Sequence, residues 1–242
     1  MVIIDTVYQK VLAIANKEQR GYITPQEFNL FADQAQKEIF EQYFYDLSQF
    51  KRIPGTEQHE SDITSMINDK LSSFTKDASL TSTSVEAGMQ QFDIPQDFYR
   101  FQNARTNFDL NGVHIEKLNK TKFFSARTSP LTTGTNKRPL MYIEEEKNQI
   151  LVQSGSKNPI QQIILQYFKN PIKPNWTYII SQGSNTAMYD ASGGGQDFEL
   201  HASEESELVY KILKLAGISM LRDDIMRAGQ GMELSQTQQE KQ

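Results

Sequence analysis

The sequence predicts an α+β protein in which helices at both ends of the chain flank a central β region. Apolar residues recur every three or four positions in the first quarter of the chain and again after residue 203, as in amphipathic helices. The centre is rich in β-branched residues and is divided by Pro, Gly and Asn turns. We expect an N-terminal helical hairpin plus a short helix, a central, mostly antiparallel β region with long loops, and a long C-terminal helix with a polar tail.

The composition is that of a globular protein with a substantial core. Of 242 residues, 38% are hydrophobic and 23% are charged, and this length allows one large domain or two small ones. We expect an N-terminal helical region over residues 1–77 and a β region over residues 78–180. Residues 181–242 hold a Gly-rich loop, a helix and the tail, and the helices from both ends are expected to pack as one bundle.

Charge and cysteine content exclude several classes of protein. The net charge of −5 argues against a general nucleic-acid binder, which needs a basic stripe to neutralise phosphates. The absence of cysteine excludes disulfides and thiolate metal sites. No apolar run approaches the roughly 20 residues that cross a bilayer, and the start MVIIDTVYQKVL lacks the basic region of a signal peptide. We expect a cytosol-like compartment, or a particle assembled there.

The stretch from residue 16 to residue 36 has two interpretations. In the first it is a calcium-binding EF-hand loop, with loop positions 1, 3, 5, 6, 8 and 12 occupied by Asn16, Glu18, Arg20, Gly21, Ile23 and Glu27. In the second, Thr24-Pro25-Gln26-Glu27 is a capping box that starts a helix, with Pro25 in its first turn.

Ligand chemistry favours the capping box. A calcium loop needs several anionic oxygens converging on the ion, but position 1 here is a neutral Asn and position 5 is a cationic Arg20. We therefore predict that Gly21 forms the turn, that Thr24 is the N-cap and that Glu27 reaches back to it from the third helical position.

Helices are expected over residues 5–15, 25–49 and 61–74, with an exposed connection over residues 50–62. The second helix carries more aromatic residues than one small hairpin can bury. They pack either in a core shared with the β region or against a neighbouring subunit, and the sequence leaves both open. The candidate packing or oligomer-interface residues, two of them from the C-terminal helix, are Phe28, Phe31, Phe40, Tyr43, Phe44, Leu208 and Ile212.

The β region is predicted to hold strands joined by polar turns. The expected strands cover residues 79–85, 89–94, 98–104, 113–118, 140–143, 149–153 and 159–168. Residues 120–136 are expected to be a polar loop, and the turn at residues 144–148 joins a hairpin.

The last quarter of the chain is predicted to be a loop, a helix and a tail. A loop of small residues covers residues 181–196, and the helix covers residues 203–227, with acidic residues first and arginines near its end. The tail from residue 228 has almost no apolar content and is expected to be disordered alone. Its Met232 and Leu234 are the candidate contacts for docking to a partner.

No pattern indicates catalysis, so we predict no enzyme activity, no cofactor and no metal. His59, His114 and His201 lie in different predicted elements without metal-ligand spacing, and the acidic run at residues 144–146 is a solvated turn. No GxSxG, P-loop or dinucleotide fingerprint occurs, and the glycines at 193–195 indicate a flexible loop. Basic residues of the β region leave an anion-binding surface open beside simple mixed charge: Arg100, Arg105, Lys117, Lys120, Lys122, Arg127, Lys137 and Arg138.

Several segments resemble the head-to-tail connector (adaptor, ring or neck) proteins of short-tailed phages, including the crAss-like group. The segment FDIPQDFYRFQNART resembles a strand-start motif of that family, and RPLMYIEEEKNQILVQS with IILQYFKNPIKP resembles its strand pair. DFELHASEESELVYKILKLAG resembles the closing helix, and GYITPQEFNLFADQAQKEIF the first helical hairpin.

The resemblance implies a structural virion protein without catalytic residues. Such a subunit would form a homo-oligomeric ring, often of twelve copies, below the portal and around a channel that conducts DNA without sequence-specific binding. Its partners would be the portal and neighbouring tail or ring proteins, with no membrane. The alternatives are a tail-side module that binds a host surface or a fibre and, further off, an EF-hand-like calcium protein.

Overall fold

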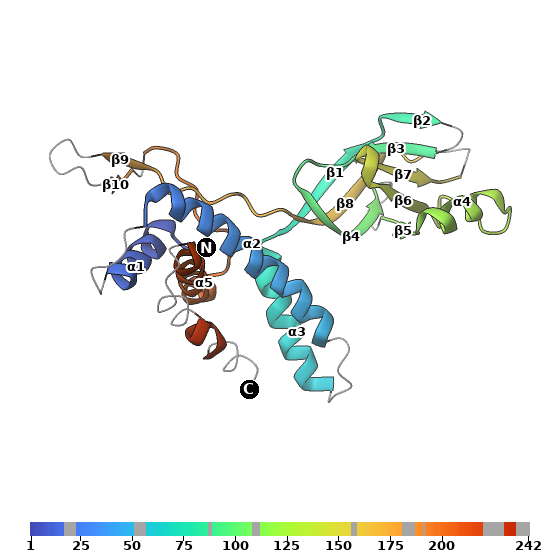
Figure 1. Ribbon diagram of the computed structural model, residues 1–242. Helices are drawn as coiled ribbons and strands as arrows, with labels where there is room; N and C mark the ends of the chain where they lie inside the picture. The colour runs from blue at the N-terminus through green and yellow to red at the C-terminus, as the bar shows by residue number, and fades with distance from the viewer. Residues whose placement is uncertain are drawn as a thin grey trace. The chain divides into compact units, whose positions relative to one another are not determined.

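The computed structural model describes residues 1–16, 23–50, 57–86, 89–107, 112–155, 159–180, 187–190, 192–219 and 230–235. The chain forms two compact units. Unit 1 comprises residues 1–73 and 171–242, and unit 2 comprises residues 74–170 (Figure 1). Unit 2 is therefore inserted into unit 1, and both chain termini belong to unit 1.

The helices of unit 1 come from both ends of the chain and pack together. They are α1 (Ile4–Asn16), α2 (Pro25–Phe50), α3 (Glu57–Ser72), a short 3-10 helix η2 (Ala202–Glu204) and α5 (Glu205–Ser219). Helix α5 contacts both α1 and α2, and α3 packs on α2. Apolar residues at helical spacing, such as Val7 and Val11 of α1 and Leu208 and Ile212 of α5, are fully buried. The bundle therefore forms because each helix buries one apolar stripe.

Irregular backbone of unit 1 is held by side chains of α2. The Gln36 amide, which is fully buried, donates to the Ile172 carbonyl at 2.8 Å and accepts from the Glu199 backbone N–H at 3.1 Å. The Asn29 side-chain oxygen accepts from the Trp176 backbone N–H at 2.8 Å. These amides satisfy backbone groups that have no sheet or helix partner.

A two-stranded hairpin completes unit 1. Strand β9 (Tyr178–Ile180) pairs antiparallel with β10 (Ala187–Tyr189), and Ile179 lies opposite Met188. Isolated bridges also join Val2 to Phe198 and Asn175 to Gln196, which ties the start of the chain to its last third.

Unit 2 contains two sheets. The first has the order β1-β8-β4 and is antiparallel throughout, with β1 at Thr75–Thr81, β8 at Gln162–Lys169 and β4 at Phe98–Thr106. The second has the order β2-β3-β7-β6-β5, and only its β5–β6 pair is parallel. Its strands are β2 (Ser84–Glu86), β3 (Met89–Asp93), β7 (Gln149–Gln153), β6 (Leu140–Glu144) and β5 (Glu116–Lys117).

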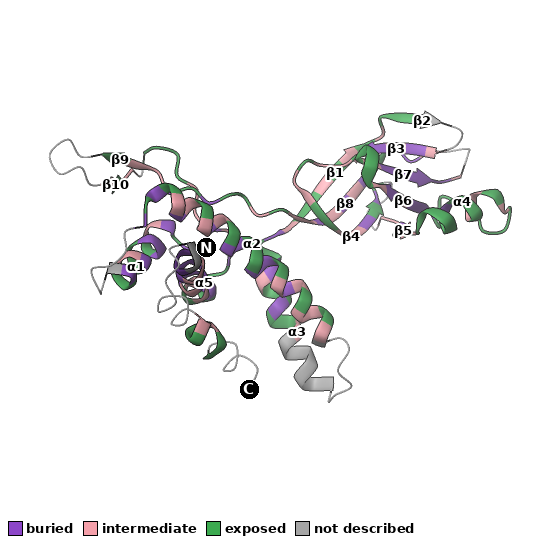
Figure 2. Ribbon diagram, viewed as in Figure 1, coloured by how far each residue is buried: buried purple, intermediate pink, exposed green. Residues whose placement is uncertain are grey.

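The core of unit 2 lies between the two sheets (Figure 2). Buried residues from the first sheet, such as Leu165 and Tyr167, share one cluster with Phe92, Met141 and Val152 of the second. The other face of the second sheet packs against α4 (Lys120–Thr128), through Phe123 on Leu140 and Leu151. The second sheet is thus covered on both faces, whereas the first is covered by the second on one face only.

The observed α+β class agrees with the expectation, but four local predictions are wrong. The single strand expected over residues 79–85 is divided between β1 and β2, which lie in different sheets. Residues 120–128 form α4 although a loop was expected, because burial of Phe123 on the sheet stabilises a helix with no apolar stripe of its own. Residues 187–189 form β10 within the predicted loop, since pairing with β9 supplies their hydrogen bonds. Helix α3 begins at Glu57 and ends at Ser72, so it covers part of the predicted connection, and β1 starts directly after it.

The tail also differs from its expectation. Residues 230–235 are helical. Residues 230–235 have little apolar content to stabilise a helix, and ion pairs from Glu233 to α5 hold them instead. Residues 220–229 and 236–242 lie outside the described residues.

Candidate functional site

The capping residues at the start of α2 contact each other. The Glu27 carboxylate accepts from the Thr24 backbone N–H at 3.0 Å and from the Thr24 hydroxyl at 2.8 Å, and the Thr24 hydroxyl oxygen accepts from the Glu27 N–H at 3.3 Å. The backbone hydrogen bond from Thr24, aided by its side chain, lowers the pKa of Glu27. The carboxylate that a calcium loop would need at position 12 is therefore used as a helix cap. Residues 17–22, including Gly21, lie outside the described residues.

The seven candidate interface residues lie mainly inside unit 1. Phe28, Phe40 and Tyr43 of α2 are buried, as are the two from α5, and Phe31 and Phe44 are half-buried. The Phe28 ring packs edge-on against Tyr8 of α1 at a centroid distance of 4.8 Å. The buried members of this set pack within a single chain, and the part of all seven in an interface with a second copy stays a prediction. The structure describes one chain, so the predicted oligomer stays a prediction.

The tail segment 230–235 lies against α5 through one carboxylate. Glu233 pairs with Lys211 at 2.8 Å and with Lys214 at 2.9 Å. The Lys211 side chain is only 6% exposed and also lies 3.4 Å from Glu207. Met232 and Leu234, on either side of Glu233, are exposed, and their docking to a partner stays a prediction.

Electrostatics stabilise this tail contact, which we call the Glu233 clamp (Glu233, Lys211, Lys214 and Glu207). Burial alone raises the pKa of Glu233, but the hydrogen bonds and positive charges of the two lysines outweigh it and hold that pKa below its usual range. Burial alone lowers the pKa of Lys211, and the two carboxylates outweigh it, so its pKa is raised. Both groups stay charged because each one neutralises the other.

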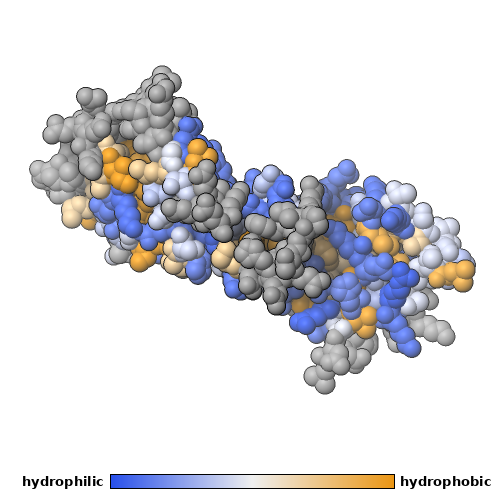
Figure 3. Space-filling view, turned by 90° about the horizontal axis from the view of Figure 1, so that it is seen from below, coloured by the Kyte–Doolittle hydropathy of each residue, from blue (hydrophilic) through white to orange (hydrophobic). Residues whose placement is uncertain are grey.

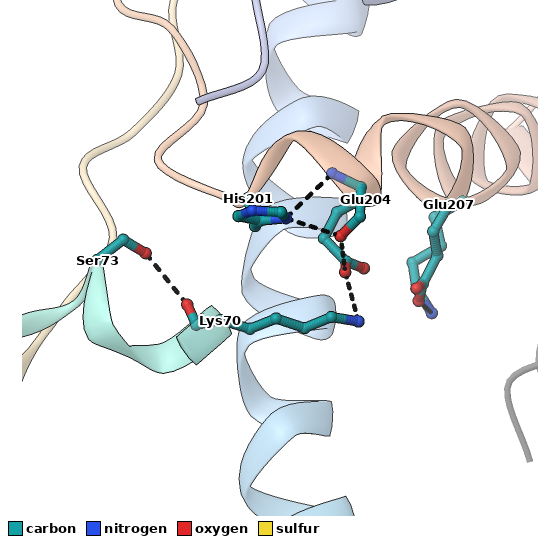
Figure 4. Close-up of polar contacts among 7 residues, drawn as sticks. Lys70, Ser73, His201, Glu204 and Glu207 are labelled. Carbon is teal, nitrogen blue, oxygen red and sulfur yellow. Dashed lines mark hydrogen bonds and ion pairs between the residues drawn. The ribbon is translucent and has the colours of Figure 1, made fainter. Parts of the chain in front are cut away.

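A second polar cluster joins α3 to the start of α5 (Figure 4). We call it the α3–η2 junction, formed by Lys70, His201, Ser203 and Glu204. Lys70 Nζ lies 2.7 Å from Glu204 Oε1, and the Ser203 hydroxyl donates to the same oxygen at 3.0 Å. The Glu204 side chain is only 2% exposed, and these two partners satisfy its buried carboxylate.

His201 caps the 3-10 helix. Its Nδ1 accepts from the Ser203 backbone N–H at 3.3 Å and lies 3.0 Å from the Ser203 hydroxyl oxygen. A cavity of about 270 Å³ adjoins the junction and is lined by His201, Lys70 and Asp69 among others. This site could not be predicted from the sequence, because Lys70 and Glu204 lie 134 positions apart.

The junction has the residue types of a nucleophile and a base but not their arrangement. A general base for Ser203 would need a free nitrogen or carboxylate. His201 Nδ1 is occupied by the helix cap, and the Glu204 carboxylate is neutralised by Lys70. The geometry therefore fits a structural ion pair that fixes α3 to η2.

The other residues considered from the sequence do not meet at one site. His114 is exposed and joins Arg105 only through a backbone bridge, and the side chain of His59 lies outside the described residues. Lys117 lies over the Phe101 ring at 4.9 Å. Residues Glu145–Lys147 form a short 3-10 turn, η1, in the β6–β7 hairpin. Among the described residues no group of three or more His, Asp or Glu is placed to hold a metal ion.

The β9–β10 hairpin exposes three large apolar side chains. Ile179, Ile180 and Met188 are 56%, 61% and 55% exposed. Ile179 and Met188 are cross-strand partners and share one face, and Ile180 lies on the opposite face. Figure 3 shows that apolar side chains lie among hydrophilic ones at the surface of the protein.

The hairpin is anchored at its root by the single tryptophan. Trp176 is fully buried, and its indole N–H donates to the Asp5 carboxylate at 2.9 Å. Its ring lies against Tyr8 at 4.0 Å and stacks on Tyr178 and Tyr189 of the hairpin at 5.9 Å each. The hairpin is thus fixed to α1 while its apolar residues face outward.

Comparisons with known proteins assign no family to this chain. No protein-family model matches it, and no curated protein matches it closely enough to count as a relative. Within the described residues, none of the helices combines the length and the apolar character that a membrane crossing requires.

Proposed function

We propose that this chain is a structural subunit of an oligomeric ring at the head-to-tail interface of a short-tailed phage. The ring would join the portal to the tail and surround the DNA channel in the virion neck. The proposal starts from the sequence resemblance to connector proteins and adds one structural observation, the exposed apolar hairpin of unit 1.

The hairpin has the features of a contact between copies. Residues 176–189 contain no charged residue, and both faces of the hairpin expose apolar side chains. A two-stranded hairpin is marginal in water unless something packs against it, and an exposed apolar patch is typical of an interaction site. Anchoring by Trp176 lowers the entropy lost on binding, because the hairpin is already held in place.

In this arrangement unit 1 forms the belt of the ring, with each hairpin lying on the neighbouring copy. The exposed tail residues Met232 and Leu234 would contact the portal or an adjacent ring, and unit 2 would meet the next tail component. The net charge of −5 suits a channel wall along which DNA slides, since tight phosphate contacts would impede ejection.

The experiment compares the full chain with Ile179→Asp and with a control, Leu131→Asp. Leu131 is 95% exposed and lies in unit 2, so its change adds the same charge away from the hairpin. Sedimentation-velocity ultracentrifugation at high protein concentration is expected to show ring-sized oligomers for the full chain and the control, and monomers for Ile179→Asp.

Subunits of this kind often assemble only on the portal, so a second measurement is needed. Mass spectrometry of purified virions of the encoding phage is expected to find the chain at the copy number of the portal. A chain that stays monomeric and is absent from the virions would overturn the proposal.

A second candidate function rests on unit 2. The first sheet leaves one face uncovered by the described elements of that unit, as a module that binds a host surface or a fibre would require. A chain present at the tail tip, in fewer copies than the portal, would favour this function over the ring.

A further inference from the structure

One face of the β1-β8-β4 sheet is not covered by the second sheet. Polar side chains on this face lie in rows across the three strands. Side chains alternate between faces along a strand, and Ala78, Leu165 and Ala104 point into the core of unit 2. Their neighbours Asp77, Gln166 and Asn103 therefore point outward. We call the outward side the outer face and use this name below.

A β-bulge brings the three polar residues into line. The register of β4 on β8 shifts between Phe101 and Asn103, so that Asn103 lies opposite Gln166. On the other side of β8, Asp77 also lies opposite Gln166. Three planar polar side chains thus form one row across three strands. Without the bulge, Asn103 would turn to the opposite face.

A pocket of about 100 Å³ lies at this row. It is lined by Asp77, Asn103, Ala104, Arg105, Ile164 and Gln166, so that a carboxylate, two amides and a guanidinium surround an aliphatic side chain. The volume is that of a part of a small molecule, and it exceeds the space that a single water requires.

One polar atom of a residue that lines the pocket lacks a partner among the described residues. The Asn103 side-chain oxygen is buried and accepts no hydrogen bond from the described residues. Buried polar atoms nearly always have a partner, and an unpaired acceptor costs about 1–3 kcal/mol. A donor from outside the chain would remove this cost.

We propose that the pocket binds a neutral polyhydroxyl group, such as part of a saccharide residue. Asn103 and Asp77 supply acceptors for hydroxyl protons, and Arg105 donates to hydroxyl oxygens. The Gln166 amide offers both a donor and an acceptor, and Ile164 contacts the C–H face of a sugar ring. A hydroxyl is both donor and acceptor, so adjacent hydroxyls match this mixed set.

The same residues disfavour charged ligands. A phosphate at Arg105 would face the Asp77 carboxylate, and a metal ion at Asp77 would face the Arg105 guanidinium. Because the pocket holds one negative and one positive side chain, any charged ligand is repelled by one of them, so the pocket favours a neutral ligand. The inference does not depend on ring assembly, because every residue involved belongs to unit 2.

The test uses the isotope-labelled full chain in solution. Glucose, galactose and N-acetylglucosamine are titrated separately while backbone amide resonances are followed by NMR. At least one sugar is expected to shift the resonances of Asn103, Arg105 and Gln166, with a dissociation constant on the order of millimolar for so small a site.

Variants separate the pocket from the rest of the outer face. Asp77→Ala and Asn103→Ala each remove an acceptor and are expected to weaken binding about tenfold. Asn107→Ala is the matched control, since that amide donates to Gln162 and does not line the pocket. It is expected to bind as the unchanged chain does.

Three outcomes would overturn the inference. These are no pocket shifts with any of the three sugars, equal binding by folded Asp77→Ala, and stronger shifts at Arg105 with inorganic phosphate than with any sugar. Asp77 is exposed, so its change should leave the fold intact even if Asn103→Ala disturbs the bulge.

Discussion

At the residue scale, Asp97 joins three parts of unit 2 through one carboxylate. It accepts from the buried Tyr167 hydroxyl at 2.7 Å and pairs with Lys76 at 2.7 Å, and its carbonyl accepts from the Asn170 N–H. Burial alone raises the pKa of Asp97, but the bonds from Lys76 and Tyr167 outweigh it, so the pKa is lowered. The pKa of Tyr167 is raised by burial and by this carboxylate. The turn after β3 is thereby fixed to β1 and β8.

Replacing Asp97 with Asn should lower the free energy of unfolding by about 1–2 kcal/mol at neutral pH. The change keeps one acceptor for Tyr167 but removes the charge, and the ion pair itself contributes little because solvent screens it. Urea unfolding at several pH values measures the difference. Asp93→Asn is the control, because Asp93 is an exposed carboxylate at the end of β3.

The pH dependence has a definite sign. The folded pKa of Asp97 lies below its unfolded value of about 4, so the charge contributes fully above that value. The contribution is lost as the pH falls through the folded pKa. The unchanged chain and Asp97→Asn should therefore converge in stability below about pH 4. A difference that grew on acidification would contradict this account.

At the scale of elements, the Glu233 clamp decides whether residues 230–235 stay on α5. Glu233→Gln removes the charge that neutralises Lys211 and Lys214, leaving the nearly buried Lys211 with Glu207 alone. We expect the segment to lose hydrogen-exchange protection and the chain to lose about 1–3 kcal/mol of stability.

The control for the clamp is Glu205→Gln, which breaks a more exposed ion pair between α5 and Lys10 of α1. An exposed pair is worth about 0–1 kcal/mol, so exchange in residues 230–235 should not change. Equal protection of the segment in Glu233→Gln and in the unchanged chain would show that other contacts hold it.

The helices and the strand pairs with strong patterns could be predicted from the sequence. Helix α2 begins at Pro25 as expected, and the hairpin of β6 and β7 lies where alternation and the acidic turn placed it. In these elements the periodic apolar residues are the residues that the fold buries.

Elements without their own pattern could not be predicted. Helix α4 buries only Phe123, and β10 has three residues, so neither shows a period in the sequence. Both depend on the surface they pack against or pair with. The two polar sites could not be predicted for the same reason. Lys70 pairs with Glu204, and Asp77 lines one pocket with Asn103, only after distant segments of the chain come together.

At the scale of the whole molecule, unit 2 should fold without unit 1. It has its own core between two sheets, and Thr75 near its start pairs with Phe168 near its end. Residues 74–170 expressed alone should show a β-type circular dichroism spectrum and one cooperative thermal transition. A broad transition with exposed apolar surface would show instead that the unit needs the rest of the chain.

The insertion of unit 2 also bears on the order of events during synthesis. Unit 1 cannot form its helical bundle until α5 has been made, and its two parts are separated by a loop of roughly 100 residues. If unit 2 folds first, its paired ends shorten that loop to a few residues. Shortening a loop from roughly 100 residues to about three halves its length about five times. Each halving lowers the entropic cost of loop closure by about 0.6 kcal/mol, so the cost of closing unit 1 would fall by about 3 kcal/mol. The inserted unit would thus act as an internal folding aid for the helices that precede and follow it.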